Sequence, residues 1–141
     1  MFRTLLILLF MGATPVHSAG FSGPAFDGHA LGSVERVIDG DTIKMRVAIW
    51  LDQEITVAVR VAGIDAPELF RPRCDAERTL ALEAKVFAED FLKNGEAELT
   101  DIEQGKYAGR VVANINAAGG DLGAALVSAG LASSGGKGNW C

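Results

Sequence analysis

Apolar and polar residues alternate along two stretches of the first half of the chain, as in β-strands with one buried face. In residues 42–50, polar side chains separate the apolar residues Ile43, Met45, Val47 and Ile49. In residues 55–61, the apolar residues fall at odd positions, so Arg60 is expected on the face opposite Val59 and Val61. Further strands are predicted over residues 32–38, 96–102 and 109–116, with turns at residues 39–40, 51–53 and 117–120.

A helical periodicity replaces the alternation after residue 75. We expect a helix from Ala76 to Asn94, with Asp75 as its N-cap and Gly95 at the C′ position. Its core stripe is formed by Leu80, Ala84, Phe87 and Phe91. Asp121 is expected to cap a short helix that runs through Ala129 and is ended by Gly130. Five short strands with a helix after the third predict a β-rich α+β fold, a five-stranded OB-fold barrel with about two helices.

The first residues have the pattern of a signal peptide. Arg3 precedes an apolar run over residues 5–11, which is too short to span a bilayer, and small residues follow at positions 18–19. We expect cleavage after Ser18 or Ala19; an uncleaved anchor is the alternative. The predicted organisation is a signal peptide at 1–19, a flexible arm at 20–30, a single domain at 31–132 and a C-terminal tail at 133–141. The mature protein is expected to be secreted or periplasmic, monomeric and free of the membrane.

Charge and histidine content exclude several functions. The formal net charge of the chain is −5, and loss of Arg3 with the leader leaves 12 basic and 18 acidic side chains, a balance of −6. An acidic balance argues against a passive nucleic-acid binder, which usually carries a basic patch. His29 is the one histidine outside the leader, which excludes a histidine-rich zinc site or a relay of several histidines.

The chain has two cysteines, Cys74 and Cys141. In an exported protein, an even pair suggests a disulfide, which would fix the Gly- and Ser-rich tail against the segment after residue 68. Two free thiols are the alternative.

A set of charged residues interrupts the apolar pattern: Asp39-Gly40-Asp41-Thr42, Arg60, Asp65-Ala66-Pro67-Glu68 and Arg110. Carboxylates hold hard cations, and two arginine forks fit phosphate oxygens. A remaining carboxylate, Glu68, can position or deprotonate a water. Together these groups predict phosphodiester hydrolysis. The alternative is structural: Asp39-Gly40 as a tight turn with a left-handed glycine, residues 66–68 as a strand exit, and Arg60 in a surface ion pair.

The order DGDT, strand arginine, DAPE, helix and KYxGR resembles the staphylococcal nuclease (thermonuclease) family, from about Gly32 to Ala132. The resemblance implies an OB-type barrel that cleaves DNA and RNA with calcium. It implies that Asp41 and Asp65 bind calcium (Ca²⁺), with the carbonyl of Ala66 as a third ligand and Asp39 just outside them. It assigns catalysis to Arg60, Glu68 and Arg110, and substrate contacts are expected from Lys106 and Tyr107.

Three features depart from the family pattern. Tyr107 lies three residues before Arg110, where the family more often has two, and the type member's nucleotide-contacting tyrosines are replaced by residues 133–136, Ser-Ser-Gly-Gly. The chain also ends where the type member continues into a third helix.

Together, the charged residues, the N-terminal segment and the family resemblance predict a secreted, calcium-dependent endonuclease acting on DNA and/or RNA. The alternatives are a non-catalytic OB-fold binding module and a phosphodiesterase acting on another substrate.

Overall fold

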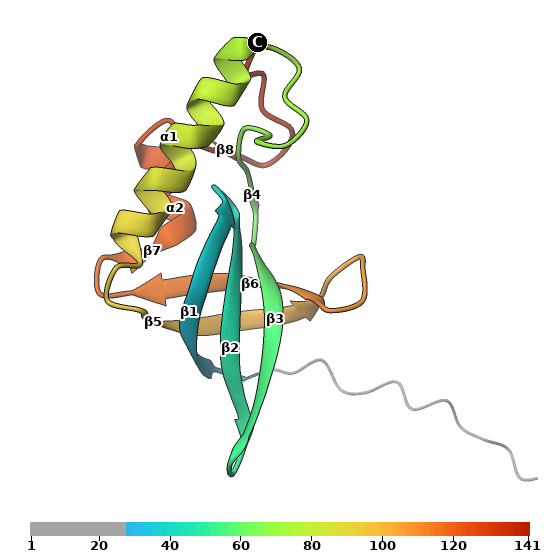
Figure 1. The fold of residues 1–141 in the computed structure, drawn as a ribbon, viewed down its shortest axis with the longest axis vertical. Coiled ribbons are helices and arrows are strands. Elements are labelled where there is room, and N and C mark those ends of the chain that lie inside the picture. The colour runs from blue at the N-terminus through green and yellow to red at the C-terminus, as the bar shows by residue number, and fades with distance from the viewer. Residues whose placement is uncertain (1–27) are drawn as a thin grey trace, which may run out of the picture.

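Five long strands build the barrel in the computed structural model, which describes residues 28–141 (Figure 1). The predicted signal peptide and most of the predicted arm lie outside the described residues. The long strands are β1 (Ala30–Asp39), β2 (Thr42–Trp50), β3 (Gln53–Val61), β5 (Glu96–Gln104) and β6 (Arg110–Ala117). β1, β2 and β3 pair antiparallel in sequence order, and β5 pairs antiparallel with both β1 and β6. Parallel pairing between β3 and β6 closes the sheet, which confirms the predicted five-stranded barrel.

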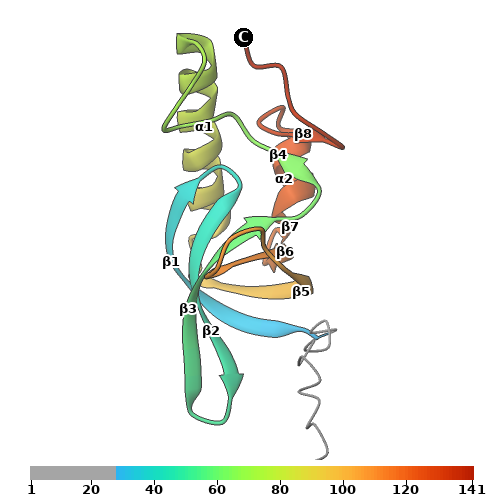
Figure 2. The same cartoon turned by 90° about the vertical axis from the view of Figure 1, so that its right-hand side faces the viewer.

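Two helices and three two-residue strands complete the fold over residues 28–141. The helices are α1 (Asp75–Phe91) and α2 (Leu122–Ser128), and the two-residue strands are β4 (Ile64–Asp65), β7 (Gly120–Asp121) and β8 (Ser133–Ser134). Figures 1 and 2 both place the start of α1, the β4–β8 pair and the C-terminus at one end of the molecule, and the tip of the β2–β3 hairpin at the other. Among the described residues, no helix has the length and apolar character needed to cross a bilayer.

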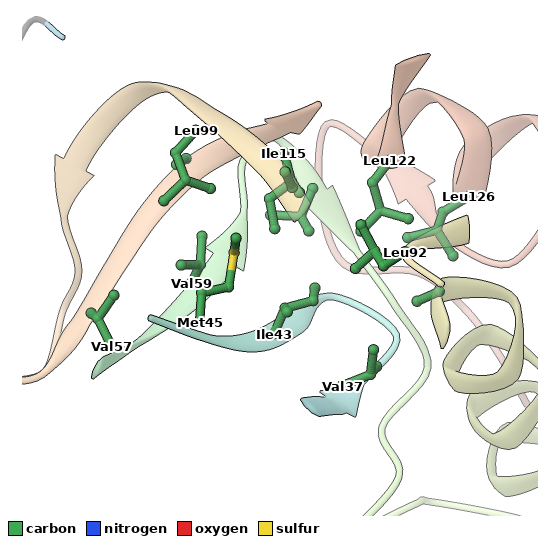
Figure 3. Packing of buried hydrophobic residues seen from close by; sticks show 14 of the residues in the cluster. Val37, Ile43, Met45, Val57, Val59, Leu92, Leu99, Ile115, Leu122 and Leu126 are labelled. Carbon is green, nitrogen blue, oxygen red and sulfur yellow. The ribbon is translucent and has the colours of Figure 1, made fainter. Parts of the chain in front are cut away.

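The core confirms most of the predicted alternation (Figure 3). The inward residues of β2 and β3 are buried together with leucines and isoleucines of the other elements: Ile43, Met45, Val47, Val57, Val59, Val61, Leu99, Ile115, Leu122 and Leu126. The prediction is wrong at Ile49 and Ile55, whose side chains are 49% and 43% exposed. Pairing of β2 with β1 stops at Val47, whereas pairing with β3 continues to Trp50, so the hairpin extends beyond the barrel and has no core to face.

The first helix differs from its prediction in three details. Its N-cap is Cys74, whose backbone is extended and whose sulfur accepts the Glu77 N–H, so the assignment to Asp75 is wrong. The helix ends at Phe91 with Leu92 as C-cap, so Gly95, with φ of +77°, lies in the next turn and not at C′. Its most deeply buried apolar side chains are small: Ala81, Ala84 and Ala88. Leu80, Phe87 and Phe91 are all half-buried, and of these Phe87 and Phe91 pack against the core.

The second helix follows its prediction. Asp121 is the N-cap, and its Oδ1 accepts the Ala124 N–H at 2.6 Å. Gly130, with φ of +73°, follows the C-cap Ala129 and is therefore at C′.

Candidate active site

A hollow of about 320 Å³ is lined by residues of the barrel, the start of α1 and the tail. Its lining contains nearly all of the predicted site residues: Asp39, Asp41, Arg60, Asp65, Ala66, Glu68 and Arg110. A larger hollow of about 420 Å³ lies elsewhere, between Leu31, Arg46 and Glu98, and contains none of them. The fold therefore brings residues from four separate segments to one place.

The turn between β1 and β2 carries Asp41, and Gly40 fixes where this turn lies. Gly40 is not among the glycines with positive φ, so the alternative interpretation of a left-handed turn glycine is wrong. A Cβ on Gly40 would lie 2.7 Å from the Cβ of Ala84 on α1 and 3.0 Å from that of Ala66. Glycine is required here because the turn packs closely against both the helix and the segment after β4.

Arg60 ties the two predicted metal ligands together. Its Nη1 donates to Asp41 Oδ1 at 2.7 Å, and its Nη2 lies 3.6 Å from Asp65 Oδ1. The Ala66 N–H donates to the other oxygen of Asp41 at 2.9 Å. The Asp41 carboxylate is only 6% exposed, and these donors offset the cost of burying its charge.

A second carboxylate adds negative charge beside Asp41. The Asp41 N–H donates to Asp39 Oδ1 at 3.2 Å. The pKa of Asp39 is raised to about 6, mainly by burial and to a smaller extent by the neighbouring Asp41 carboxylate. A cation bound beside Asp39 would favour its charged form and lower this pKa.

The two arginines meet because β3 and β6 are neighbours. Ala58 pairs with Arg110 and Arg60 with Val112 in this parallel register. Residues two apart on a strand share a face, so both arginine side chains lie on the same side and line the same hollow. Residues 105–109 form the loop between β5 and β6, and Arg110 is the first residue of β6.

Lys106 and Tyr107 lie on that loop, and neither lines the hollow. The Tyr107 side chain is 62% exposed, and Lys106 Nζ is 5.6 Å from the centre of its ring. These two predicted substrate contacts therefore lie outside the hollow, although the Arg110 N–H donates to the Tyr107 carbonyl at 3.2 Å.

Residues 66–74 connect β4 to α1, and Glu68 begins the part of this connection, residues 68–73, that its own carboxylate shapes as a loop. Glu68 Oε1 accepts the N–H groups of Phe70 at 2.9 Å and Arg71 at 3.4 Å. Beneath the loop lies Glu77, a residue that is only 3% exposed. Glu77 accepts the N–H groups of Arg73 at 2.6 Å and Glu68 at 3.4 Å.

Sequence reasoning missed Glu77. The hydrogen bonds that Glu77 accepts from the loop lower the pKa of its carboxyl, and the bond from the Arg73 N–H has the largest effect. The spacing Cys74-x-x-Glu77 matches a capping box with cysteine in place of serine, and this signal would have drawn attention to it.

The tail forms another wall of the hollow. The predicted bond between Cys74 and Cys141 is present, so that prediction is confirmed. β8 pairs with β4, and the Gly138 N–H donates to Asp65 Oδ2 at 3.0 Å. Lys137 and Trp140 line the hollow on this side. The sequence predicted the bridge but not this contact with Asp65, which depends on the path of the tail through space.

The carboxylates of the hollow provide the oxygen ligands that Ca²⁺ prefers. Within residues 28–141, no group of three or more His, Cys, Asp or Glu side chains is arranged to hold a metal ion. Asp41 and Asp65 nevertheless face one shared positive group, and each carboxylate oxygen has two lone pairs. Ca²⁺ takes six to eight ligands, so this pair fits as part of a site whose remaining ligands include water.

A family model described as staphylococcal nuclease homologue matches residues 58–137, more than half of the chain. The match includes Arg60, Asp65, Glu68 and Arg110 and begins after Asp41. No curated protein matches the chain. The model confirms the resemblance that the sequence motifs suggested.

Proposed function

Because the chain belongs to the family of staphylococcal nuclease homologues, we propose that it is a calcium-dependent endonuclease that hydrolyses phosphodiester bonds of DNA, RNA or both. The observation that carries the proposal is the convergence of two arginines, Glu68 and the Asp41–Asp65 pair on one hollow. Arginine forks bind phosphate oxygens and stabilise charge that develops during displacement. A structural turn and a surface ion pair would not require this convergence.

Arg60 and Arg110 are the phosphate-binding groups in this proposal. Hydrogen bonds to Asp41 and to the Ile64 carbonyl hold the Arg60 guanidinium before substrate arrives. Such preorganisation removes the cost of orienting the donor during reaction. Arg110 lines the same hollow from the neighbouring strand, and in this proposal the two forks would bind one phosphate.

Glu68 is the proposed general base. It lies in the lining of the same hollow, and both of its backbone contacts go to Oε1. Its carboxylate would accept a proton from the attacking water. Asp41 and Asp65, with the carbonyl of Ala66, would hold Ca²⁺, which when bound supplies positive charge to the phosphate.

The test is cleavage by the protein lacking residues 1–19, purified in its oxidised form. Single-stranded DNA and RNA, labelled at either end, should be cut at internal positions with calcium and left intact with excess chelator. Asp41→Ala should lose both calcium binding and cleavage, whereas Glu83→Gln, an exposed change on α1, should retain both. Intact polymers with wild-type protein and calcium would favour the non-catalytic module, and cleavage in chelator would contradict the calcium assignment.

We also propose that the protein acts outside the cytoplasm. The apolar N-terminal segment of the sequence and the Cys74–Cys141 bridge support this location, because disulfides persist in oxidising compartments. Fractionation of cells that express the full chain tests the proposal, since a cytoplasmic, full-length product would contradict it.

A further inference from the structure

We propose that Glu77 is a positioning residue for hydrolysis: its carboxylate holds the loop that carries Glu68 and so directs the Glu68 carboxylate toward the hollow. The inference rests on the proposed nuclease function and assigns a role to a residue outside the motifs of the sequence. Glu77 itself is not required to touch the substrate.

The contacts of Glu77 go to two points of the loop. Oε1 accepts the backbone N–H of Glu68, where the loop begins. Oε2 accepts the backbone N–H of Arg73, where the loop ends, and the Arg73 Nε at 3.3 Å. One side chain on α1 therefore fixes both ends of the segment 68–73.

The burial of Glu77 supports a specific role. A carboxylate buried without partners is strongly unfavourable, and replacing it with an apolar residue would then stabilise the protein. Here the charge is accommodated by N–H donors of the loop and by its place in the first turn of α1, where the helix dipole favours a negative charge. These donors belong to the loop, so the carboxylate is stabilised only when the loop has this shape.

Other contacts hold the residues on either side of the segment 68–73, whereas Glu77 holds the segment itself. Ala66, before the loop, is held by Asp41, and Cys74, after it, is held by the bridge to Cys141. Residues 68–73 form no helix or strand. The Glu68 carboxylate accepts N–H groups within this segment, and Glu77 connects the segment to α1. Small errors in the placement of a reacting group are costly in rate.

The experiment uses Glu77→Gln, which is isosteric but places an NH₂ group where one carboxylate oxygen accepted an N–H. Turnover should fall about 10- to 100-fold, the scale of a misplaced catalytic group, while KM should change by less than about threefold because Arg60 and Arg110 are untouched. Glu83→Gln makes the same charge change on an exposed part of α1 and should leave both constants unchanged. Circular dichroism checks that each variant is folded, and Glu77→Asp provides a second variant that retains the charge but not the reach.

A double-mutant cycle separates positioning from a general loss of structure. In a Glu68→Gln background, Glu77→Gln should cost less than about threefold in residual turnover, because its effect passes through a group already removed. Equal costs in both backgrounds would overturn the proposal, as would an unchanged kcat in a folded Glu77→Gln protein.

Hydrogen exchange reports on the loop independently of activity. The Glu68 and Arg73 amides should exchange faster in Glu77→Gln than in Glu83→Gln. Unchanged exchange would show that Glu77 does not hold the loop. If wild-type protein cleaves nothing, the nuclease proposal fails and the catalytic role fails with it, while faster exchange would still establish the contact.

Discussion

Removal of the Cys74–Cys141 bridge should destabilise the protein strongly. The bridge joins residues 67 apart in the sequence, and the chain-entropy model gives about 4 kcal/mol for a loop of that length. Without the bridge, the tail beyond β8 is free to detach while the barrel stays folded, which restores some entropy to the native state. We therefore expect a loss of about 2–4 kcal/mol, or roughly 8–15 °C in Tm for a domain of this size.

The variants need to separate the bridge from the helix cap. Cys74 is also the N-cap of α1, and serine retains an acceptor at that position. Cys74→Ser with Cys141→Ser therefore removes the bridge alone. Cys74→Ala with Cys141→Ser removes both features and should be less stable by about a further 1 kcal/mol.

Thermal unfolding followed by circular dichroism gives the Tm of each variant, and thiol titration of the denatured, oxidised wild-type protein should find no free thiol. Cleavage at 25 °C should fall less than stability, because the bridge supplies no reacting group. Two titratable thiols in the oxidised wild type, or equal Tm values for wild type and the double serine variant, would refute the reasoning.

Three further predictions concern the site and its supports. Arg60→Lys should lower cleavage about 10²-fold or more with little change in Tm, because lysine keeps the charge but loses the fork; near-full turnover would show that Arg60 does not clamp phosphate. Gly40→Ala should cost about 1–3 kcal/mol in unfolding free energy, because its Cβ would overlap Ala84; denaturant titration measures this, and an unchanged midpoint would contradict the close contact. The lowered pKa of Glu77 means that its stabilising effect is complete above its ordinary pKa of 4.5 and is lost as the pH falls through the lowered value. The stability difference between wild type and Glu77→Gln should therefore shrink in acid, and a constant difference from pH 7 to pH 3 would contradict this.

Local pattern was sufficient to predict the barrel and most of its buried positions. Alternation in residues 42–50 and 55–61 correctly placed Ile43, Met45 and Val59 inside, since every second residue of a strand faces one side. The prediction failed at Ile49 and Ile55 because alternation does not reveal where a hairpin leaves the barrel. It also missed Cys74 as N-cap, since cysteine is not among the usual capping residues.

The motifs identified most of the site, but not the residues that support it. Arg60, Asp65 and Glu68 are recognisable by their order along the chain. Glu77 and Gly138 act through backbone contacts that exist only after the loop and the tail have packed together. No spacing along the sequence records the approach of Gly138 to Asp65, because it depends on the bridge and on the β4–β8 pairing.

The parallel pairing of β3 with β6 would make the proposed catalysis a measure of complete folding. Hairpins such as β2–β3 and β5–β6 can form from neighbouring residues, but Arg60 and Arg110 meet only when the distant strands β3 and β6 join. Contacts between distant segments form late, because the loop entropy must be overcome first. In refolding, helix and hairpin signals should therefore recover before cleavage does. A partly folded chain would hold its two arginines apart and remain inert toward nucleic acid.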